Sequence, residues 1–477
     1  MRMEFLSRNP HPDGVGRTQR RGVESEGVSV PGRVPRRAAF AVVAVALALS
    51  VVTWPGAMNV DALTQIGQVR SGRYNDWHSG VLVPLWRPLW LLGLGPGWVY
   101  LSSVVVLSMG LFGVLATAMR RRTAVGLTVA LLAYPPLLGF AVYWGRDQWF
   151  VGSLLAAVVA LLLMTRTSRE GHRRPTMLFL VAVWAMLATR QNAPPAAIVL
   201  IVAAMLLGGL GTRWRWLQRR GPGRWQGMLQ TATVTVTAGV MALTMLVSQE
   251  VIRRVAHVSH IHPEQQTLFY DLAAISIDTD SSWFPNGVYD GDVATLEQAF
   301  NVVDVFPLVQ PPDPVIHPLR AGEYRNLVEA WAQAVLHNPA SYLQARWDLF
   351  RHQLAIAGPV DHVFHDQVDP NEWGYHFAFP GAFDRVRSYL AASTFGSGQH
   401  GGPLHTVWVY VLVTIAGLGW FRSDRMQRRV LAWACAATLV NLGGFFFGAA
   451  GASYRFAWPS VVIGCLVAVV FAVDQTR

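Results

Sequence analysis

The sequence predicts an all-α protein that crosses a membrane about ten times. Of its 477 residues, 52% are hydrophobic and only 14% are charged. A soluble domain usually carries about 25% charged residues, so this deficit indicates a chain that lies mostly in a lipid bilayer. Much of the chain consists of apolar runs of near-spanning length, and short arginine clusters separate them. These features predict a polytopic helical membrane protein.

Ten apolar segments are candidate transmembrane helices. A span needs about 20 mostly apolar residues. Several of these segments are shorter than that, so we expect flanking residues to extend them. The segments are residues 38–54, 92–119, 123–143, 149–164, 177–189, 193–211, 229–247, 404–420, 430–447 and 456–473.

Arginine placement predicts the orientation of the chain. All 39 basic residues are Arg, and the clusters at 120–122, 166–174, 213–224 and 422–429 each follow an even-numbered span. Loops rich in positive charge stay in the cytoplasm, so both termini are expected there. The use of Arg without Lys, with abundant Ala, Gly and Val, is typical of bacteria. The predicted location is therefore the bacterial cytoplasmic (inner) membrane.

The same pattern divides the chain into four regions. Residues 1–37, rich in Arg, Gly, Pro and Ser, are predicted to form a disordered basic cytoplasmic tail. Residues 38–249 form an N-terminal transmembrane module with a first outer loop at 55–91. Residues 250–403 form a mainly helical extracytoplasmic domain, and residues 404–477 form the C-terminal transmembrane helices. Apolar residues at helical spacing before and after 337–339 predict a helical hairpin in the outer domain.

Net charge and cysteine use bear on two other classes of protein. The formal charge of +11 is compatible with nucleic-acid binding. The arginine clusters lie between apolar runs, however, as cytoplasmic loops do, so we expect no nucleic-acid partner. Cys435 and Cys465 both lie inside apolar runs, so the outer domain has no disulfide framework.

The first outer loop contains the pattern of an amphipathic helix. Val60, Leu63, Ile66 and Val69 recur every third residue, and polar residues take the complementary positions. We therefore expect a helix that lies at the membrane interface.

Asp61 lies on the polar side of that helix near its start, after a candidate cap at Asn59. As an acid at a helix N-terminus, it can simply complement the helix dipole. It can also act as a general base at the membrane surface.

A polar segment and an apolar segment complete the first outer loop. Asp76 and His78 lie two residues apart, either as part of a capped turn or as groups that orient a sugar or a phosphate-bound divalent cation. Residues 81–90 are apolar and aromatic and are interrupted by Pro84 and Pro88. They predict a second interfacial segment.

Three arginines lie on the outer side, against the general bias of positive charge. Arg146 precedes the fourth span next to Asp147, Arg190 follows the fifth, and Arg455 precedes the last. Ionisable groups at membrane depth are costly unless they are paired or line a cavity. The arginines can snorkel to the interface or pair with Asp147. Alternatively, Arg190 and Arg455 meet in one cavity around a shared anionic group.

Two groups of histidines are candidate metal ligands. The first contains His257, His260 and His262, and the second lies at residues 361–366. Neither has a recognised zinc spacing on a predicted helix. Ordinary loop histidines are therefore the default interpretation.

These features together resemble the glycosyltransferase C superfamily of multi-pass enzymes that use polyprenyl-phosphate-linked sugars, and in particular a bacterial subgroup. Gln191 stands where the subgroup has His, and the Arg-Tyr motif before the last span is in altered order. The resemblance covers most of residues 40–470 and is carried by the segments 54–61, 74–78, 146–147, 190–192 and 454–459.

The resemblance implies a mechanism. Arg146, Arg190 and Arg455 would bind the phosphate of a polyprenyl-phosphate sugar donor. Asp61 would deprotonate the acceptor hydroxyl of a cell-envelope glycan, lipid or protein, with inversion at the anomeric carbon. Asp76, His78 or Asp147 would orient the acceptor or a divalent cation; no other cofactor is implied. These seven residues are the predicted site.

Two other functions are compatible with the sequence. A transporter or flippase of lipid-linked sugars would place charges at mid-membrane, whereas the charges here cluster at the span ends. A non-catalytic protein of envelope assembly is the second alternative.

The arginine pattern makes a direct topological prediction. Reporter fusions after Arg174 and after Arg320 should report the cytoplasmic and the outer side, respectively, because the positive-inside rule places them on opposite faces. Alkaline phosphatase and fluorescent-protein fusions can measure this. Identical signals from the two sites would contradict the topology.

Overall fold

The computed structural model is mostly helical, with 71% helix and 4% strand. It describes residues 36–167, 173–207, 224–310, 314–317, 319, 322–395 and 400–476. The predicted tail at 1–37 lies almost entirely outside the described residues, as do parts of the arginine clusters at 166–174 and 213–224. The mainly helical fold expected from the sequence is confirmed.

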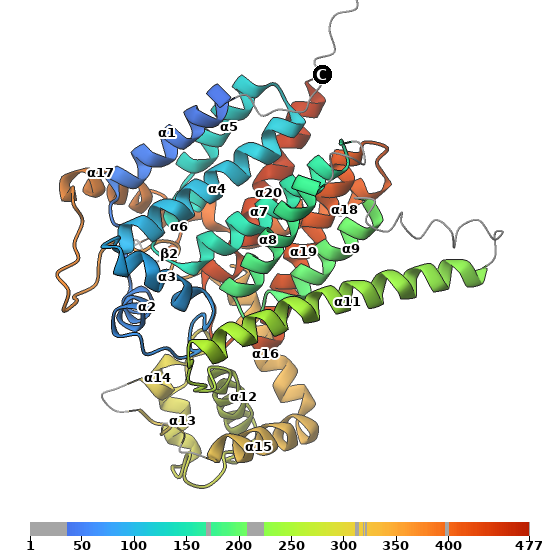
Figure 1. The fold of residues 1–477 in the computed structure, drawn as a ribbon. Coiled ribbons are helices and arrows are strands. Elements are labelled where there is room, and N and C mark those ends of the chain that lie inside the picture. Colours follow the sequence, from blue (N-terminus) through green and yellow to red (C-terminus); the bar gives the residue numbers. More distant parts are fainter. Residues whose placement is uncertain are drawn as a thin grey trace, which may run out of the picture. The chain divides into compact units, whose positions relative to one another are not determined.

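Four helices of the described chain are long and apolar enough to cross a membrane, namely α4, α7, α19 and α20. The number rises to five if the bent pair α5–α6 is counted as one span. The other predicted spans also coincide with helices. The bundle (Figure 1) consists of α1 (Arg36–Val52), α4 (Pro96–Ala118), α5 (Arg121–Ala133), α6 (Pro135–Ala141), α7 (Arg146–Met164), α8 (Arg173–Thr189), α9 (Pro194–Leu207), α11 (Arg224–Val255), α18 (Val407–Leu418), α19 (Met426–Gly448) and α20 (Tyr454–Gln475).

The segment 123–143 is not the straight span that its hydropathy suggests. It is divided into α5 and α6, which are bent by 77°. Pro135 and Pro136 explain the bend, because proline removes a backbone donor and restricts the preceding residue. The carbonyl of Pro136 accepts hydrogen bonds from Tyr454 Oη at 3.3 Å and Trp458 Nε1 at 3.1 Å. The bend is thus stabilised by the first turns of α20.

Small residues allow the central helices α4 and α7 to pack closely. A Cβ atom at Gly110 would lie 2.6 Å from Leu155 Cβ, and one at Gly152 would lie 2.8 Å from a methyl group of Val106. Such close approach of backbones is a common basis of helix association in membranes. It places α7, which begins at Arg146, in the middle of the bundle core.

The residues predicted to lie outside the membrane, which we call the outer part of the chain, have their own hydrophobic core at one end of the bundle (Figure 1). It contains α12 (Gln265–Asp278), α13 (Val293–Ala299), α14 (Phe306–Val309), α15 (Glu323–His337) and α16 (Pro339–Gln353). The predicted hairpin is confirmed, since α15 and α16 are separated only by Asn338. Phe445 and Ala449, at the end of α19, belong to the same core and attach it to the bundle.

The described residues of the segment 354–403 do not join that core, although the sequence suggested one domain over 250–403. They contain α17 (Pro380–Ala391), β1 (Thr394–Phe395), β2 (His400–Gly401) and the 3₁₀ helix η3 (Pro403–His405). Leu390 of α17 packs on Leu138 and Val142 beside the bend. Val360 and Val363 are part of the bundle core. This segment, which we call the outer segment, therefore covers the bundle end and the first outer loop.

The first outer loop forms α2 (Val60–Ser71) and α3 (Leu82–Leu91). Asn59 caps α2, because its Oδ1 accepts from Ala62 N at 3.0 Å. The predicted helix is present, and Gln65 and Gln68 on its polar face are buried within the protein. A Cβ atom at Gly67 would lie 3.3 Å from Trp373. Trp373 therefore packs on the side of α2 that carries Gly67, whereas Gln68 on the polar face bonds Asn75 of the same loop.

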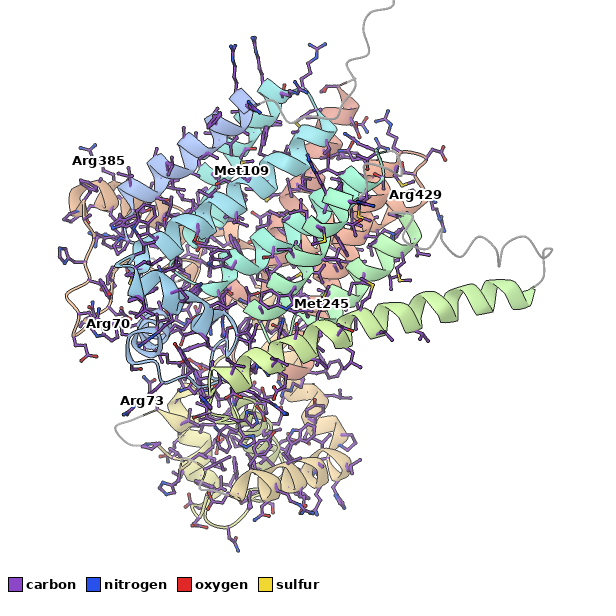
Figure 2. All side chains as sticks on the ribbon, viewed as in Figure 1. Arg70, Arg73, Met109, Met245, Arg385 and Arg429 are labelled. Atoms are coloured by element: carbon purple, nitrogen blue, oxygen red, sulfur yellow. The ribbon has the colours of Figure 1, made fainter. Side chains whose placement is uncertain are left out.

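Arginine side chains lie at both ends of the bundle (Figure 2). Arg70 and Arg73 lie on the outer loop, whereas Arg429 lies at the start of α19 at the other end. At that other end, Arg425 and Arg428 both pair with Asp474 near the end of α20.

The outer core contains an ion pair whose disruption should be costly. Arg346 Nη2 lies 2.6 Å from Asp271 Oδ2, and both side chains are fully buried. Arg346→Met should lower the free energy of unfolding by about 3–5 kcal/mol, because it leaves a buried carboxylate without its charged partner. Denaturant unfolding of the full chain in detergent measures this.

The matched control is Arg325→Met, which removes an exposed pair with Glu329 and should cost about 0.2–1 kcal/mol. Replacing Asp271 and Arg346 together by apolar residues should restore most of the lost stability. Equal effects of the two single substitutions would contradict the buried role of Arg346.

Candidate functional site

An ion pair joins the first outer loop to the last helix. Arg455 Nη1 lies 2.7 Å from Asp61 Oδ2, although 394 positions separate the two residues. Asp61 is in the first turn of α2, and Arg455 is the second residue of α20. Asp61 is therefore paired, whereas its role as a base would require it to be free in the ground state.

Backbone pairing positions Asp61. Ala57 N donates to Val142 O at 2.9 Å, and Trp144 N donates to Ala57 O at 2.7 Å. Met58 pairs in the same way with the segment at 367–369. The four residues before α2 are thus held between the end of α6 and the outer segment, which places Asp61 beside the start of α7.

The outer part of the chain positions Arg455. The loop 449–453 between α19 and α20 donates and accepts backbone bonds with Val303 and Val305. Gln353 makes two hydrogen bonds with the backbone of Ser453, at 2.7 and 2.9 Å. Tyr454 N donates to Asp361 O at 3.1 Å. The residue that precedes Arg455 is therefore fixed by the outer segment.

Arg190 and Arg455 lie close together, whereas the shared cavity and its anionic group stay a prediction. Arg190 Nη2 donates to Arg455 O at 3.4 Å. The guanidinium carbons lie 5.8 Å (Arg190) and 5.1 Å (Arg455) from the centroid of the same Phe456 ring. Arg190 also forms an ion pair with Asp147, and both side chains are buried. Asp147 thus binds Arg190, whereas its role in orienting an acceptor or a cation stays a prediction.

Arg146 completes the cluster of three guanidiniums. Its charge interacts with the charges of Arg455 and Asp61. Among the described residues, two acids form ion pairs with two of the three arginines, and Arg146 has no ionic partner. We call Asp61, Arg146, Asp147, Arg190 and Arg455 the charged cluster.

The charges of the cluster change the protonation of Asp61 itself and of the neighbouring His78. Burial raises the pKa of Asp61, but Arg455 and Arg146 outweigh this and hold it well below its usual range. Burial and then the charge of Arg146 lower the pKa of His78 to about 3. Asp61 is therefore a carboxylate and His78 a neutral imidazole near pH 7.

Asp76 lies outside the charged cluster. Its carboxylate contacts His260 Nδ1, and Asp76 Oδ1 accepts from Ile261 N at 2.9 Å. The two sites are connected through Gln191, which donates to Asp76 O at 2.9 Å and follows Arg190 in the chain. The sequence placed Asp76 with His78, but the structure separates their roles.

The histidines at 361–366 are held by other groups. His365 Nε2 lies 3.1 Å from Met58 O, and His400 Nδ1 pairs with Asp361 at 2.5 Å. Within the described residues they do not form a metal-binding group.

Sequence reasoning did not identify two residues beside the cluster. Tyr143 donates to Asn59 Oδ1 at 2.7 Å, and Asp304 interacts with the charge of Arg455. Tyr143 directly precedes the segment 144–149 that drew attention for its charges, whereas Asp304 had no distinguishing signal.

No protein-family model matches the chain, and neither a curated protein nor a solved structure is similar to it. The interpretation of the cluster therefore depends on its geometry and chemistry.

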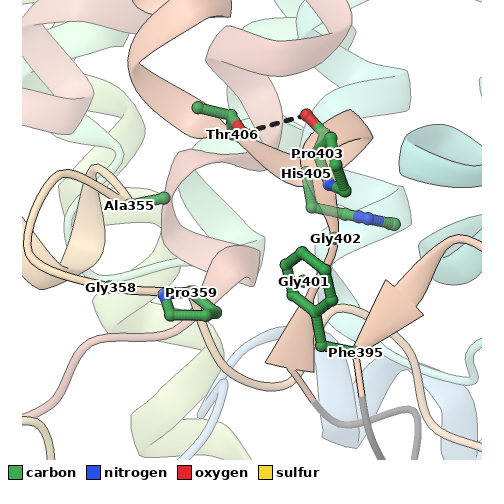
Figure 3. Close-up of a pocket in the computed structure, with 9 residues that line it drawn as sticks. All are labelled: Ala355, Gly358, Pro359, Phe395, Gly401, Gly402, Pro403, His405 and Thr406. Atoms are coloured by element: carbon green, nitrogen blue, oxygen red, sulfur yellow. Dashed lines mark hydrogen bonds between the residues drawn. The ribbon is translucent and has the colours of Figure 1, made fainter.

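A separate cavity of about 280 Å³ lies beside η3 (Figure 3). Its walls include Pro359, Phe395 and His405, and no residue of the charged cluster lines it. His405 contacts Tyr454 edge-on, at 5.4 Å between ring centroids. The cavity thus lies behind the residue that precedes Arg455.

The unequal pairing of the arginines predicts unequal effects on stability. Asp147→Asn should lower the free energy of unfolding by about 3–5 kcal/mol, because Arg190 then remains buried without its partner. Arg146→Gln should change it by less than about 1 kcal/mol, because no ion pair is lost and a like charge beside Arg455 is removed. Thermal unfolding in detergent compares the two; a larger loss for Arg146→Gln would contradict this account.

Proposed function

We propose that this protein is a membrane glycosyltransferase that moves a sugar from a polyprenyl-phosphate donor to an envelope acceptor, as an inverting enzyme of the glycosyltransferase C type. The observation that carries the proposal is that Arg455 and Arg146 lie at Asp61 and that Arg190 lies next to Arg455, although these residues come from four helices far apart in the sequence. Such a cluster provides an anion site next to a carboxylate base.

The chemistry of the cluster favours a phosphate. Arg190 Nε and Arg455 Nε are buried donors with no hydrogen-bond partner among the described residues. Buried donors normally have acceptors, and one phosphate can accept from several guanidiniums. The N-terminal turns of α2, α7 and α20 meet there, and helix N-termini favour anions. A lipid-linked sugar phosphate supplies both the charge and the membrane location.

The pairing of Asp61 with Arg455 suggests how the base is released. In the proposal, the donor phosphate replaces Asp61 as the partner of Arg455, and Asp61 then accepts the proton of the acceptor hydroxyl. The hydroxyl oxygen attacks the anomeric carbon, and the bond from that carbon to the phosphate oxygen breaks. The electron pair leaves with polyprenyl phosphate, which the arginines stabilise.

The remaining site residues have supporting roles in this proposal. Asp147 holds Arg190 in place, and neutral His78 is a hydrogen-bonding group beside Asp61. Asp76 lies at the rim next to His260. The proposed transfer step itself does not need a divalent cation, because the guanidiniums supply the positive charge.

The finer topology belongs to the same proposal. We propose that ten helices cross the bacterial inner membrane with both termini in the cytoplasm, and that the charged cluster lies at the outer leaflet. Five of these spans would be α4, α7, α19, α20 and the bent pair α5–α6. The other five would be supplied by the segments 38–54, 177–189, 193–211, 229–247 and 404–420. A lipid donor could then enter from the bilayer, with the acceptor coming from outside.

A flippase is the main rival. It would need polar groups along a pathway at mid-membrane. The charged cluster lies instead at the first turns of α7 and α20 and just after α8, so transfer at one face is favoured.

Reconstituted protein with radiolabelled polyprenyl-phosphate sugars tests the proposal. Transfer to membrane-extract acceptors should be detected, and Asp61→Asn should lower turnover by about 10²–10⁴-fold, as expected for loss of a general base. Arg455→Lys should weaken donor binding, because a forked contact becomes a point charge.

The matched control is Glu297→Gln, which alters an exposed acid of α13 and should keep full turnover. A folded Asp61→Asn variant with unchanged turnover would remove Asp61 as the base. Movement of labelled donor across the vesicle membrane without any transfer would favour the flippase.

A further inference from the structure

A second group of ligating side chains lies in the loop before α12, outside the charged cluster. His260, His262 and Glu264 each place a donor atom within 4.8 Å of the others' donor atoms. The ring centroids of the two histidines are 4.1 Å apart, and His262 Nδ1 lies 3.2 Å from Glu264 Oε1. His257, on the same loop, is not part of the group.

Asp76 orients His260 from the first outer loop. Its carboxylate contacts Nδ1 of His260, which leaves Nε2 of that ring available. Asp76 Oδ1 accepts from Ile261 N, so the carboxylate is itself fixed. Metal-binding histidines commonly donate their second ring N–H to a carboxylate, which sets the tautomer and raises the basicity of the ligating nitrogen. The arrangement matches that pattern.

His262 is also held in a defined orientation. Its backbone adopts a left-handed conformation, with φ of 53°, which turns the chain back towards Glu264. Its ring stacks on Tyr324 of α15, with centroids 3.8 Å apart. The three donors thus come from one tight loop, and Asp76 and Tyr324 support it from two other parts of the chain.

We propose that His260, His262 and Glu264 bind a zinc-type divalent cation, with Asp76 as the outer partner of His260. Two imidazoles and one carboxylate suit zinc, and three protein ligands leave a fourth position for water or a ligand. An all-oxygen set would suit magnesium or calcium instead. The cation would attach the loop before α12 to the first outer loop. This proposal is independent of the proposed transferase activity.

Metal binding can be measured directly on the full chain. The protein, purified without a polyhistidine tag and treated with chelator, should bind one equivalent of Zn²⁺ in competition with a chromophoric chelator. Co²⁺ should give the visible absorption of a four-coordinate site. Zn²⁺ should raise the thermal transition, whereas Mg²⁺ and Ca²⁺ at the same concentration should not.

Two substitutions form a matched pair. His257 and His262 both have positive φ, and Asn tolerates that conformation, so His257→Asn and His262→Asn should both keep the fold. His262→Asn should lose the one-equivalent binding and the thermal shift, whereas His257→Asn should keep both. Asp76→Asn should weaken Zn²⁺ binding by about 10–100-fold, as loss of an outer partner does.

Several results would overturn the proposal. These are no saturable Zn²⁺ binding by the wild-type protein, equal binding by the His262→Asn and wild-type proteins, or a preference for Mg²⁺ or Ca²⁺. In each case the four side chains would form only histidine–carboxylate pairs. None of these readouts depends on sugar transfer, so the two proposals can fail separately.

Discussion

The ion pair between Asp61 and Arg455 is the contact on which the arrangement of the outer face depends. Both charges are partly buried, and removing one partner of a buried ion pair is strongly destabilising. The pair can form only if the first outer loop reaches the start of the last helix. Bringing those two ends of the chain together places Arg146 and Arg190 beside them, because both lie at helix ends on the same face.

The outer part of the chain also holds this contact in place. The loop 449–453 is bonded to residues of the outer core, and Arg346 reaches from α16 to the carbonyl of Ala449. The segment 354–403 covers the other partner, since Met58 and Gly67 lie against it. The outer segment is therefore part of the site, and it does not behave as an attached domain.

The cluster also illustrates the opposition between stability and function. The guanidinium of Arg146 next to Arg455 destabilises the folded state through charge repulsion and desolvation. A protein with a purely structural role would gain nothing from this residue. Residues that break local rules in this way are commonly found where a ligand supplies the missing charge. In the proposed enzyme, that ligand is the donor phosphate, and its negative charge would balance the excess positive charge of the three arginines.

Local patterns in the sequence predicted much of the fold. Apolar run length located the helices, and the spacing around residues 337–339 located the outer hairpin, because burial in lipid or in a core selects periodic apolar residues. The bend between α5 and α6 was less evident, although Pro135 and Pro136 are its cause. Hydropathy does not distinguish a bent pair from a straight span.

The sequence by itself determined that this is a mainly helical chain with several apolar, span-like helices, and it predicted which charges are anomalous. Only the tertiary structure decided which of those charges meet. It paired Asp61 with Arg455 and Arg190 with Asp147, and it separated Asp76 from His78 by placing His260 between the outer loop and α12. The physical reason is that apolar periodicity is a local property, whereas charge pairing depends on contacts between residues up to 394 positions apart.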